Sequence, residues 1–426
     1  MVKKNFFIFL FTLIILLFFN EQTLSLILGK EKIFFDLRLI IFVLNLLLII
    51  FLFFILFSKK ILNIKKIIKL IYLNIFFIFI MFLIIEIIFG NWFLKNNINR
   101  LHIIKDKELI IDIGEYYEFK TNYIKYKRDS YGLRGSYPNI NSINILTVGG
   151  STTDQRLISE GHTYQDILQK KFKSINKNVY IANAGIDGQS TYGHIKNFEL
   201  WFPLIPNLNP DYFLFFIGIN DFYIDSELDY DELNIETKNL NIIDSLLFYY
   251  RRDSALHYFF NTINGILISN NFNLGHQKLP KDTFNNINWT KESIQNNYEF
   301  LNESLKSYRL RLNELIEKVE ELGSKIIFVS QSEKRKYFFK DKIIYGNSEK
   351  VRVNNFYING VDYYNMSRLY INVIKEISEE KNIIFYDLDK ELKFDIKNDF
   401  YDNAHFNHLG AEKIGDYLFT KLIHLY

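Results

Sequence analysis

The sequence predicts an α/β domain with a parallel sheet, preceded by membrane-spanning helices. Residues 1–90 are almost entirely Ile, Leu and Phe, whereas residues 91–426 mix charged and aromatic side chains as a water-exposed domain does. In this second part, short β-rich apolar runs alternate with helical patterns. That order is typical of parallel strands covered by helices on both faces of a sheet.

The N-terminal part predicts three transmembrane helices, at about 5–28, 39–57 and 70–89. The last two runs are long enough to cross a hydrocarbon layer of about 30 Å. The first run is interrupted by polar residues from Asn20 to Gln22 and is also compatible with a signal peptide. Because no small-residue cleavage site follows it, we interpret it as a retained anchor.

The distribution of basic residues predicts the orientation of these helices. The loop between the second and third runs contains no acid and five lysines: Lys59, Lys60, Lys65, Lys66 and Lys69. Basic loops stay in the cytoplasm, so the N-terminus is expected inside and everything after residue 89 outside, in the periplasm or cell exterior. Trp92 lies where an interfacial aromatic residue is expected. Glu86, inside the third run, is either a functional carboxylate or one that reaches the nearby interface.

Composition excludes several classes of function. The formal charge is +3, but residues 1–90 carry 10 of the 51 basic and 4 of the 48 acidic residues, so the rest is slightly acidic. This is not the charge pattern of a nucleic-acid-binding protein. The absence of cysteine excludes disulfides and thiolate metal sites.

The elements of the sheet are expected in order along the chain. Five apolar runs predict buried strands: 143–148, 179–182, 212–217, 325–330 and 383–388. The clearest helical pattern covers 292–322, with Thr290 as its cap and Gly323 after its end. Its apolar stripe favours packing on the sheet, and a coiled-coil seam is the alternative.

Three ranges describe the expected organisation after the anchor. Residues 93–140 form a juxtamembrane segment, and residues 141–426 form the main domain. A long connection at about 222–290 interrupts this domain, and its aromatic, amphipathic stretch at 244–268 has four open interpretations. It is a lid, an acyl-chain groove, a membrane-touching element or a small helical subdomain.

The stretch "ILTVGGSTTDQ" contains the first candidate for chemistry, Ser151. The serine follows a predicted strand and precedes a predicted helix, which puts it at the carboxyl edge of the sheet, where ligand clefts lie. Gly149 and Gly150 permit a tight turn and the close approach of another molecule. Strand-to-helix turns often contain Gly and Ser, so this stretch alone does not establish a catalytic site.

Three further stretches fall at the same edge: "NAGIDGQST", "GIND" and "DNAHFNHLG". With "GGSTT" they resemble the four blocks of the SGNH (GDSL-like) hydrolase superfamily, in the correct order, over about residues 128–426. The resemblance assigns Ser151, Gly188, Asn220 and His405 to the four blocks, with Asp402 three residues before the histidine. It implies a flavodoxin-like three-layer α/β/α sandwich and no cofactor. One departure is that Gly150 stands where the family usually has Asp.

The chemistry expected of these residues is nucleophilic catalysis. Ser151 needs a base, for which His405 is the candidate, and Asp402 is the group that fixes the orientation of the imidazole. The backbone N–H groups of Ser151 and Gly188 and the side-chain amide of Asn220 are the candidates for an oxyanion hole.

Structural interpretations of the same residues stay open at this point. Gly188 is also typical of a turn, and the carboxylates near Asn220 and before His405 are also typical of helix caps. Asp402, His405 and His408 form an alternative metal-binding set. Four further histidines lack an acidic partner at a suggestive spacing and are expected to be surface or packing residues: His102, His162, His194 and His257.

The function expected from this pattern is that of a membrane-anchored serine esterase on the outer side of the membrane. Its substrate is expected to be an ester-bearing small molecule, glycan or lipid, including acetyl esters, and its oligomeric state is left open. One alternative is an O-acyltransferase that modifies an envelope polysaccharide with the same residues. Another is a non-catalytic envelope protein that retains the fold.

Overall fold

The computed structural model describes residues 64–90, 103–114, 116–222, 253–260, 287–332, 336–340, 343–353, 356–402 and 404–426, with isolated positions at 45–46, 92, 101, 246–247, 250, 263 and 276. The chain divides into two compact units. One consists of Met1–Lys95 and Glu227–Ile268, and the other of Asn96–Ser226 and Ser269–Tyr426.

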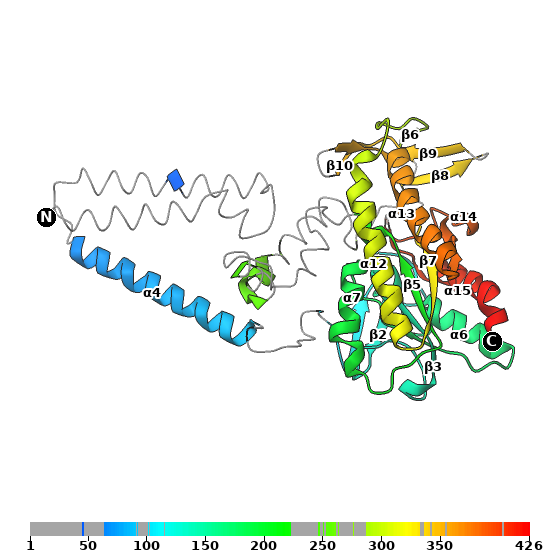
Figure 1. Cartoon of the computed structure of the whole chain (residues 1–426), viewed down its shortest axis with the longest axis horizontal. Coiled ribbons are helices and arrows are strands. Elements are labelled where there is room, and N and C mark those ends of the chain that lie inside the picture. The colour runs from blue at the N-terminus through cyan, green and yellow to red at the C-terminus, as the bar shows by residue number, and fades with distance from the viewer. Residues whose placement is uncertain are drawn as a thin grey trace. The chain divides into compact units, whose positions relative to one another are not determined.

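The second unit is built on a five-stranded parallel sheet (Figure 1). Its strands are β3 (Ile143–Gly149), β4 (Tyr180–Asn183), β5 (Tyr212–Ile217), β7 (Lys325–Ser330) and β12 (Ile384–Tyr386). They lie in the order β12-β7-β5-β3-β4, and every pair is parallel. In chain order this is 2-1-3-4-5, the flavodoxin-like arrangement, in which the first and third strands border the crevice that takes ligands.

The predicted strands are confirmed to within two residues at each end. Every residue of β5 is buried, as are all but one residue of β3 and of β7. Helices cover both faces of the sheet, which is why the strands are apolar throughout instead of alternating with polar residues.

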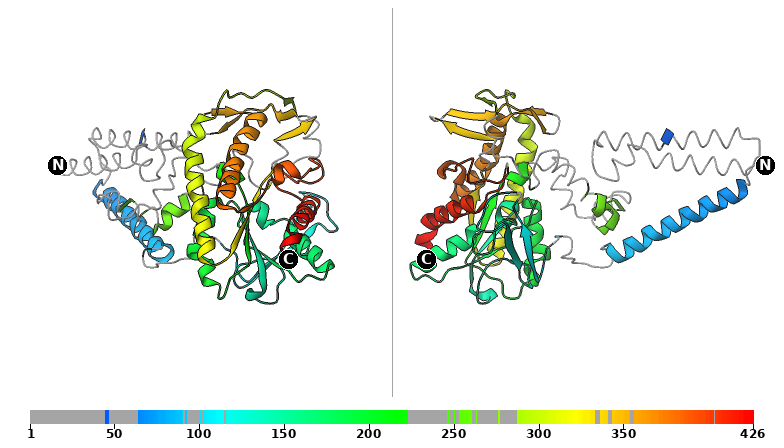
Figure 2. Two further views of the ribbon diagram at one scale, coloured as in Figure 1. Left: turned by 45° about the vertical axis from the view of Figure 1, so that its right-hand side comes forward. Right: turned by 180° about the vertical axis from the view of Figure 1, so that it is seen from behind.

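Two sets of helices form the outer layers. On one face, α6 (Tyr164–Ser174) packs against α15 (His408–Leu422), and their buried side chains form one core with the sheet. On the other face lie α7 (Thr191–Leu200), α12 (Asn302–Glu321) and α13 (Gly360–Lys381). Figure 2 shows α12 and α13 side by side, and α15 beside α6. The expected α/β fold with a parallel sheet is confirmed.

The long helix begins ten residues later than its apolar periodicity predicts. Residues 292–298 form an irregular, non-helical segment, which Asp362 binds, and Glu299–Leu301 form a 3-10 turn before α12. The Asp362 carboxylate accepts the backbone N–H groups of Ile294 and Gln295, both at 2.9 Å. Thr290 belongs to the short strand β6 (Trp289–Thr290) instead of capping the helix. The end is as predicted: Gly323, at φ +74°, follows the last turn.

The described part of the domain also contains two hairpins, a small three-stranded sheet and several short helices. The hairpin of β1 (Lys107–Asp112) and β2 (Tyr123–Arg128) lies in the expected juxtamembrane segment and packs with Leu157 and Tyr401. A three-stranded sheet joins β6 with β8 (Tyr337–Lys340) and β9 (Ile343–Asn347), and β10 (Val351–Val353) pairs with β11 (Phe356–Ile358). The short helices are α5 (Ser151–Asp154), α8 (Ile219–Phe222) and α14 (Leu388–Glu391).

In the first unit, α4 (Ile64–Phe89) contains a stretch, Tyr72–Phe89, that is long and apolar enough to cross a membrane. It is the one such helix in the part of the chain that the structure describes. The other expected spans, at 5–28 and 39–57, lie outside the described residues apart from positions 45 and 46. Multiple spans are therefore a prediction of the sequence alone.

Glu86, the carboxylate inside the third apolar run, has specific partners in the connection at 222–290. It accepts hydrogen bonds from the Ser254 hydroxyl (2.6 Å) and from the backbone N–H groups of Ala255 (3.0 Å) and Leu256 (3.1 Å). Trp92 Nε1 donates to the same carboxylate at 2.8 Å. These contacts satisfy the free N–H groups at the start of the helical turns at 255–260.

Candidate active site

Ser151 is the first residue of α5, directly after β3. Gly149 is the last residue of β3. A Cβ at this position would lie 2.1 Å from the Thr153 hydroxyl and 2.6 Å from the Phe216 carbonyl oxygen. The glycine thus lets the chain turn sharply against the neighbouring strand. As a result, the serine hydroxyl emerges at the carboxyl edge of the sheet, beside β5.

The structure brings together three of the predicted residues. Ser151 Oγ lies 2.7 Å from His405 Nε2, and His405 Nδ1 lies 2.7 Å from Asp402 Oδ2. The serine and the histidine are 254 residues apart in the sequence. This is the order of nucleophile, base and orienting carboxylate that activates a serine hydroxyl.

Asp402 is fixed by its own loop. Its other carboxylate oxygen accepts the backbone N–H groups of Ala404 (2.9 Å) and His405 (2.7 Å). Burial raises the pKa of this carboxyl, but the His405 imidazole and these hydrogen bonds outweigh burial and hold the pKa below its ordinary value. Asp402 therefore stays ionised at neutral pH. It does not cap α15, because Asn407 does so.

The loop after β4 carries Gly188 to the same edge. Ala184 N donates to the Thr147 carbonyl at 2.8 Å, and Ile186 N donates to the Gly149 carbonyl at 3.0 Å, so this loop continues the pairing beyond the end of the sheet. Gly188 adopts φ +75°, and a Cβ there would meet nothing within 4 Å. Glycine is therefore needed for the backbone conformation, and the space in front of it is open.

Asn220 follows β5 and reaches the same loop. Its Nδ2 donates to the Gln189 carbonyl at 2.6 Å. One amide hydrogen makes this bond, and the second remains for another acceptor. Within the described residues, the backbone N–H groups of Ser151 and Gly188 donate to no protein atom.

Gly150 has a steric reason to be glycine. A Cβ at this position would lie 2.3 Å from Asn220 Nδ2 and 3.0 Å from the Gln189 carbonyl oxygen. Any side chain here, including the Asp usual in the superfamily that the sequence resembles, displaces the Asn220 amide. The glycine that stands here in place of the usual Asp thus leaves room for the Asn220 amide.

Beneath Ser151, a buried ion pair holds the end of α5. Arg128 Nη2 lies 2.6 Å from Asp154 Oδ1, and the Tyr126 hydroxyl donates to the same oxygen at 2.9 Å. The guanidinium also donates to the carbonyls of Gly132, at 2.6 Å, and Gly185. Burial acts to lower the pKa of Arg128, but the Asp154 carboxylate outweighs it and keeps the pKa above its ordinary value. The pair ties the β1–β2 hairpin to α5.

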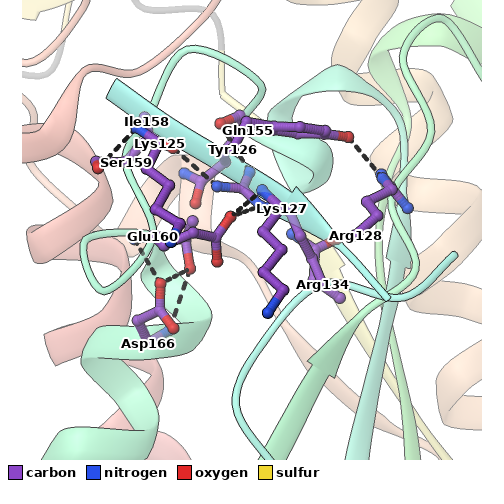
Figure 3. Close-up of polar contacts among 12 residues, drawn as sticks. Lys125, Tyr126, Lys127, Arg128, Arg134, Gln155, Ile158, Ser159, Glu160 and Asp166 are labelled. Atoms are coloured by element: carbon purple, nitrogen blue, oxygen red, sulfur yellow. Dashed lines mark hydrogen bonds and ion pairs between the residues drawn. The ribbon is translucent and has the colours of Figure 1, made fainter. Parts of the chain in front are cut away.

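A second buried arginine completes this support (Figure 3). The Arg134 guanidinium donates to the carbonyls of Asp154, Gln155 (3.0 Å) and Ile158 (2.8 Å) and pairs with Glu160 at 2.7 Å. The carbonyls of Asp154 and Gln155 lie at the C-terminal end of α5, where a cation is favoured. The sequence gives little indication of this network, because Arg134 stands in "DSYGLRG", a stretch that predicts only a turn.

Asp221, next to Asn220, is also a supporting residue. It accepts hydrogen bonds from the backbone and hydroxyl of Thr191, at the start of α7, and pairs with Arg311 of α12 at 3.3 Å. Burial raises the pKa of this carboxyl against the effect of Arg311. The contacts link the loops after β4 and β5, which carry Gly188 and Asn220.

The other predicted histidines lie away from the hydroxyl. His194 is buried, and burial lowers its pKa to about 3. His408 stacks on Tyr117, with ring centroids 5.7 Å apart, so it does not join Asp402 and His405 in a metal site. The His162 ring packs against Phe119, and His257 is buried. His102 lies outside the described residues.

One histidine beside the site gave no signal in the sequence. His276 comes from the connection at 222–290, and its ring centroid lies 4.3 Å from that of His405. Neither a motif nor a periodic pattern surrounds it, so only the fold places it there.

The model of the GDSL-like lipase/acylhydrolase family matches residues 147–413, and no curated protein matches the chain. Among solved structures, an acetyl xylan esterase variant from Geobacillus stearothermophilus is 14% identical, with 65% of this chain and 93% of that chain covered and a TM-score of 0.35. A psychrotrophic esterase from Pseudoalteromonas sp. is 11% identical, with 66% and 98% covered and a TM-score of 0.33. A lipolytic protein of the G-D-S-L family from Desulfitobacterium hafniense is 11% identical, with 65% and 97% covered and a TM-score of 0.32.

Proposed function

The chain belongs to the GDSL-like lipase/acylhydrolase family, and from this premise we propose that it hydrolyses an O-acyl ester through an acyl-enzyme on Ser151. The observation that carries the proposal is the pair of 2.7 Å contacts from Ser151 Oγ to His405 Nε2 and from His405 Nδ1 to Asp402. A hydroxyl hydrogen-bonded to an imidazole loses its proton as it attacks a carbonyl carbon.

In the acylation step, His405 takes the Ser151 proton and the hydroxyl oxygen bonds to the ester carbonyl carbon. The imidazolium is stabilised by ionised Asp402 and returns the proton to the leaving alcohol. In the second step a water molecule replaces the alcohol, with His405 again acting as the base. Proton transfer of this kind contributes about 10²–10⁴ in rate.

The negative charge that develops on the carbonyl oxygen needs donors. The backbone N–H groups of Ser151 and Gly188, which donate to no atom of the described chain, are two of them. The free amide hydrogen of Asn220 is the third, and its bond to the Gln189 carbonyl fixes the direction of the amide. Loss of one such donor typically costs about 10²–10³ in turnover.

We further propose that α4 anchors the enzyme in a membrane, with residues after 89 on the outer side. Its apolar stretch, Tyr72–Phe89, is of spanning length, and the lysine-rich sequence at 59–69 precedes it. An esterase held there meets acyl esters of envelope glycans and lipids, including acetyl esters. A periplasm-dependent reporter fused after Trp92 is expected to be active, and activity of a cytoplasm-dependent reporter at this position would contradict the orientation.

The catalytic proposal is tested with a fluorophosphonate probe and p-nitrophenyl acetate. The folded full chain is expected to be labelled at Ser151 and to release p-nitrophenol, and the Ser151→Ala variant is expected to do neither. If folded protein is not labelled, the chain is not a serine hydrolase. Addition of glycan acceptors tests the fate of the acyl group, because hydrolysis that acceptors leave unchanged argues against acyl transfer.

A further inference from the structure

A second imidazole–carboxylate pair lies against the proposed base. His276 Nε2 is 3.2 Å from Asp187 Oδ2, and the His276 ring is tilted by 33° to the His405 ring at a centroid distance of 4.3 Å. His276, Asp187 and His405 belong to the same compact unit. None of the proposed catalytic steps uses the first two residues.

The spacing of these groups is that of ligands around one metal ion. One ligand atom from each of Asp187, His276 and His405 can be chosen so that all three lie within 4.8 Å of one another. Two ligands bound at about 2.0–2.2 Å to a tetrahedral ion are separated by roughly 3.3–3.6 Å. The His276–Asp187 separation, 3.2 Å, already approaches this value, and the Asp187 side chain is exposed and so able to adjust.

The outer contacts of both imidazoles also fit metal binding. In zinc sites the ring nitrogen that does not bind the ion is held by a carboxylate or another oxygen, which fixes the ring and its tautomer. Asp402 holds Nδ1 of His405 at 2.7 Å, and the Tyr401 hydroxyl contacts Nδ1 of His276 at 2.7 Å. Nε2 of each ring is thereby the nitrogen presented to the space near Asp187.

We propose that Asp187, His276 and His405 bind a divalent transition-metal ion, with Zn²⁺ the preferred occupant, and that binding reversibly inhibits the esterase. Two imidazoles and one carboxylate suit Zn²⁺ and leave a fourth position for water. The inhibition rests on the proposed function of His405; the binding site does not.

The mechanism of inhibition is a competition for one lone pair. In the active enzyme the Nε2 lone pair of His405 accepts a hydrogen bond from the Ser151 hydroxyl. In the inhibited enzyme the same lone pair bonds to the metal ion. His276 binds the ion as the neutral tautomer with its proton on Nδ1, donated to the Tyr401 oxygen. In the free protein Nε2 of His276 faces the Asp187 carboxylate at 3.2 Å, so metal binding requires that this nitrogen carry no proton.

Zinc titrations of p-nitrophenyl acetate hydrolysis by the full chain in detergent test the inhibition. We expect saturable loss of activity that EDTA reverses. The variants His276→Gln and Asp187→Asn are each compared with their own zinc-free rate, and the zinc concentration that inhibits them should rise at least about 10-fold. The reason is that loss of even a residue that only hydrogen-bonds to a metal ligand costs about 10–100-fold in metal affinity. The matched control is His162→Gln, which removes an imidazole beside Phe119 and should leave the inhibitory concentration unchanged.

Calorimetry with the Ser151→Ala variant tests binding without any activity. We expect one Zn²⁺ bound per chain, and a loss of that binding when His276→Gln is added. If Ser151→Ala binds Zn²⁺ but the wild type shows no esterase activity, the metal site is supported and the proposed function is refuted. Equal zinc inhibition of the wild type and His276→Gln, activation by zinc, or no stoichiometric binding to Ser151→Ala would each overturn the metal site.

Discussion

Replacement of Gly150 by alanine tests whether the turn before Ser151, the proposed nucleophile, must be glycine to leave room for the proposed oxyanion donor Asn220. The backbone at Gly150 has φ −85°, outside the left-handed region that only glycine adopts readily. The added Cβ, however, would lie 2.3 Å from Asn220 Nδ2, more than 1 Å inside an ordinary contact of about 3.5 Å. The amide is the end of a side chain and can rotate away, so the protein is expected to fold with Asn220 displaced.

The magnitude follows from the donor that is lost. Displacement of the Asn220 amide removes one of three proposed oxyanion donors, which corresponds to a fall in kcat of about 10²–10³, or about 2.7–4 kcal/mol. Asn220→Ala alone should cost a similar amount, because it removes the same donor. The double variant Gly150→Ala/Asn220→Ala should be no slower than the slower single variant, since the clash and the donor disappear together.

The assay is kcat for p-nitrophenyl acetate in the two single variants and the double variant, with thermal unfolding measured beside it. The matched control is Gly323→Ala, at the end of α12 and away from the site. Its φ of +74° is unfavourable for alanine, so it should lower stability and leave kcat unchanged. Full activity in Gly150→Ala, or losses that add in the double variant, would refute the link between Gly150 and Asn220.

Three further predictions concern the base and the buried charges. His405→Ala should abolish turnover and fluorophosphonate labelling while His408→Ala retains both, and the reverse result would identify the wrong imidazole. His194 is neutral in the fold, with a pKa of about 3, and gains a proton below about pH 6.5 on unfolding. Stability is therefore lost as pH falls, by about 2 kcal/mol between about pH 7 and pH 5. Urea unfolding at both pH values should show a smaller loss in His194→Gln, and an equal loss would refute the assignment. Arg128→Ala leaves Asp154 buried without its partner and should cost about 3–5 kcal/mol in urea unfolding, while Arg128→Met with Asp154→Leu should recover much of it. A loss below about 1 kcal/mol in the single variant would exclude a buried pair.

The sequence alone determined the class of the fold, the strands of the sheet and the order of the motif residues. This was possible because strands such as β5 are buried on both faces and so are apolar along their whole length. The positions of Ser151, Gly188 and Asn220 followed from motif blocks at strand ends, and that of His405 from a block directly before the last helix; parallel strands bring such loops to one edge of the sheet. Gly323 was likewise predictable, because a left-handed residue after a helix is a local requirement.

Only the tertiary structure decided the features that depend on partners far away in the chain. The start of α12 is set by Asp362, about 60 residues later, whose carboxylate takes the N–H groups that a longer helix needs. The steric demand at Gly150 exists only because Asn220 lies against it, and His276 reaches the site from a connection without a motif. Local propensity and periodicity act over a few residues, whereas these contacts join segments that are adjacent only after the sheet has formed.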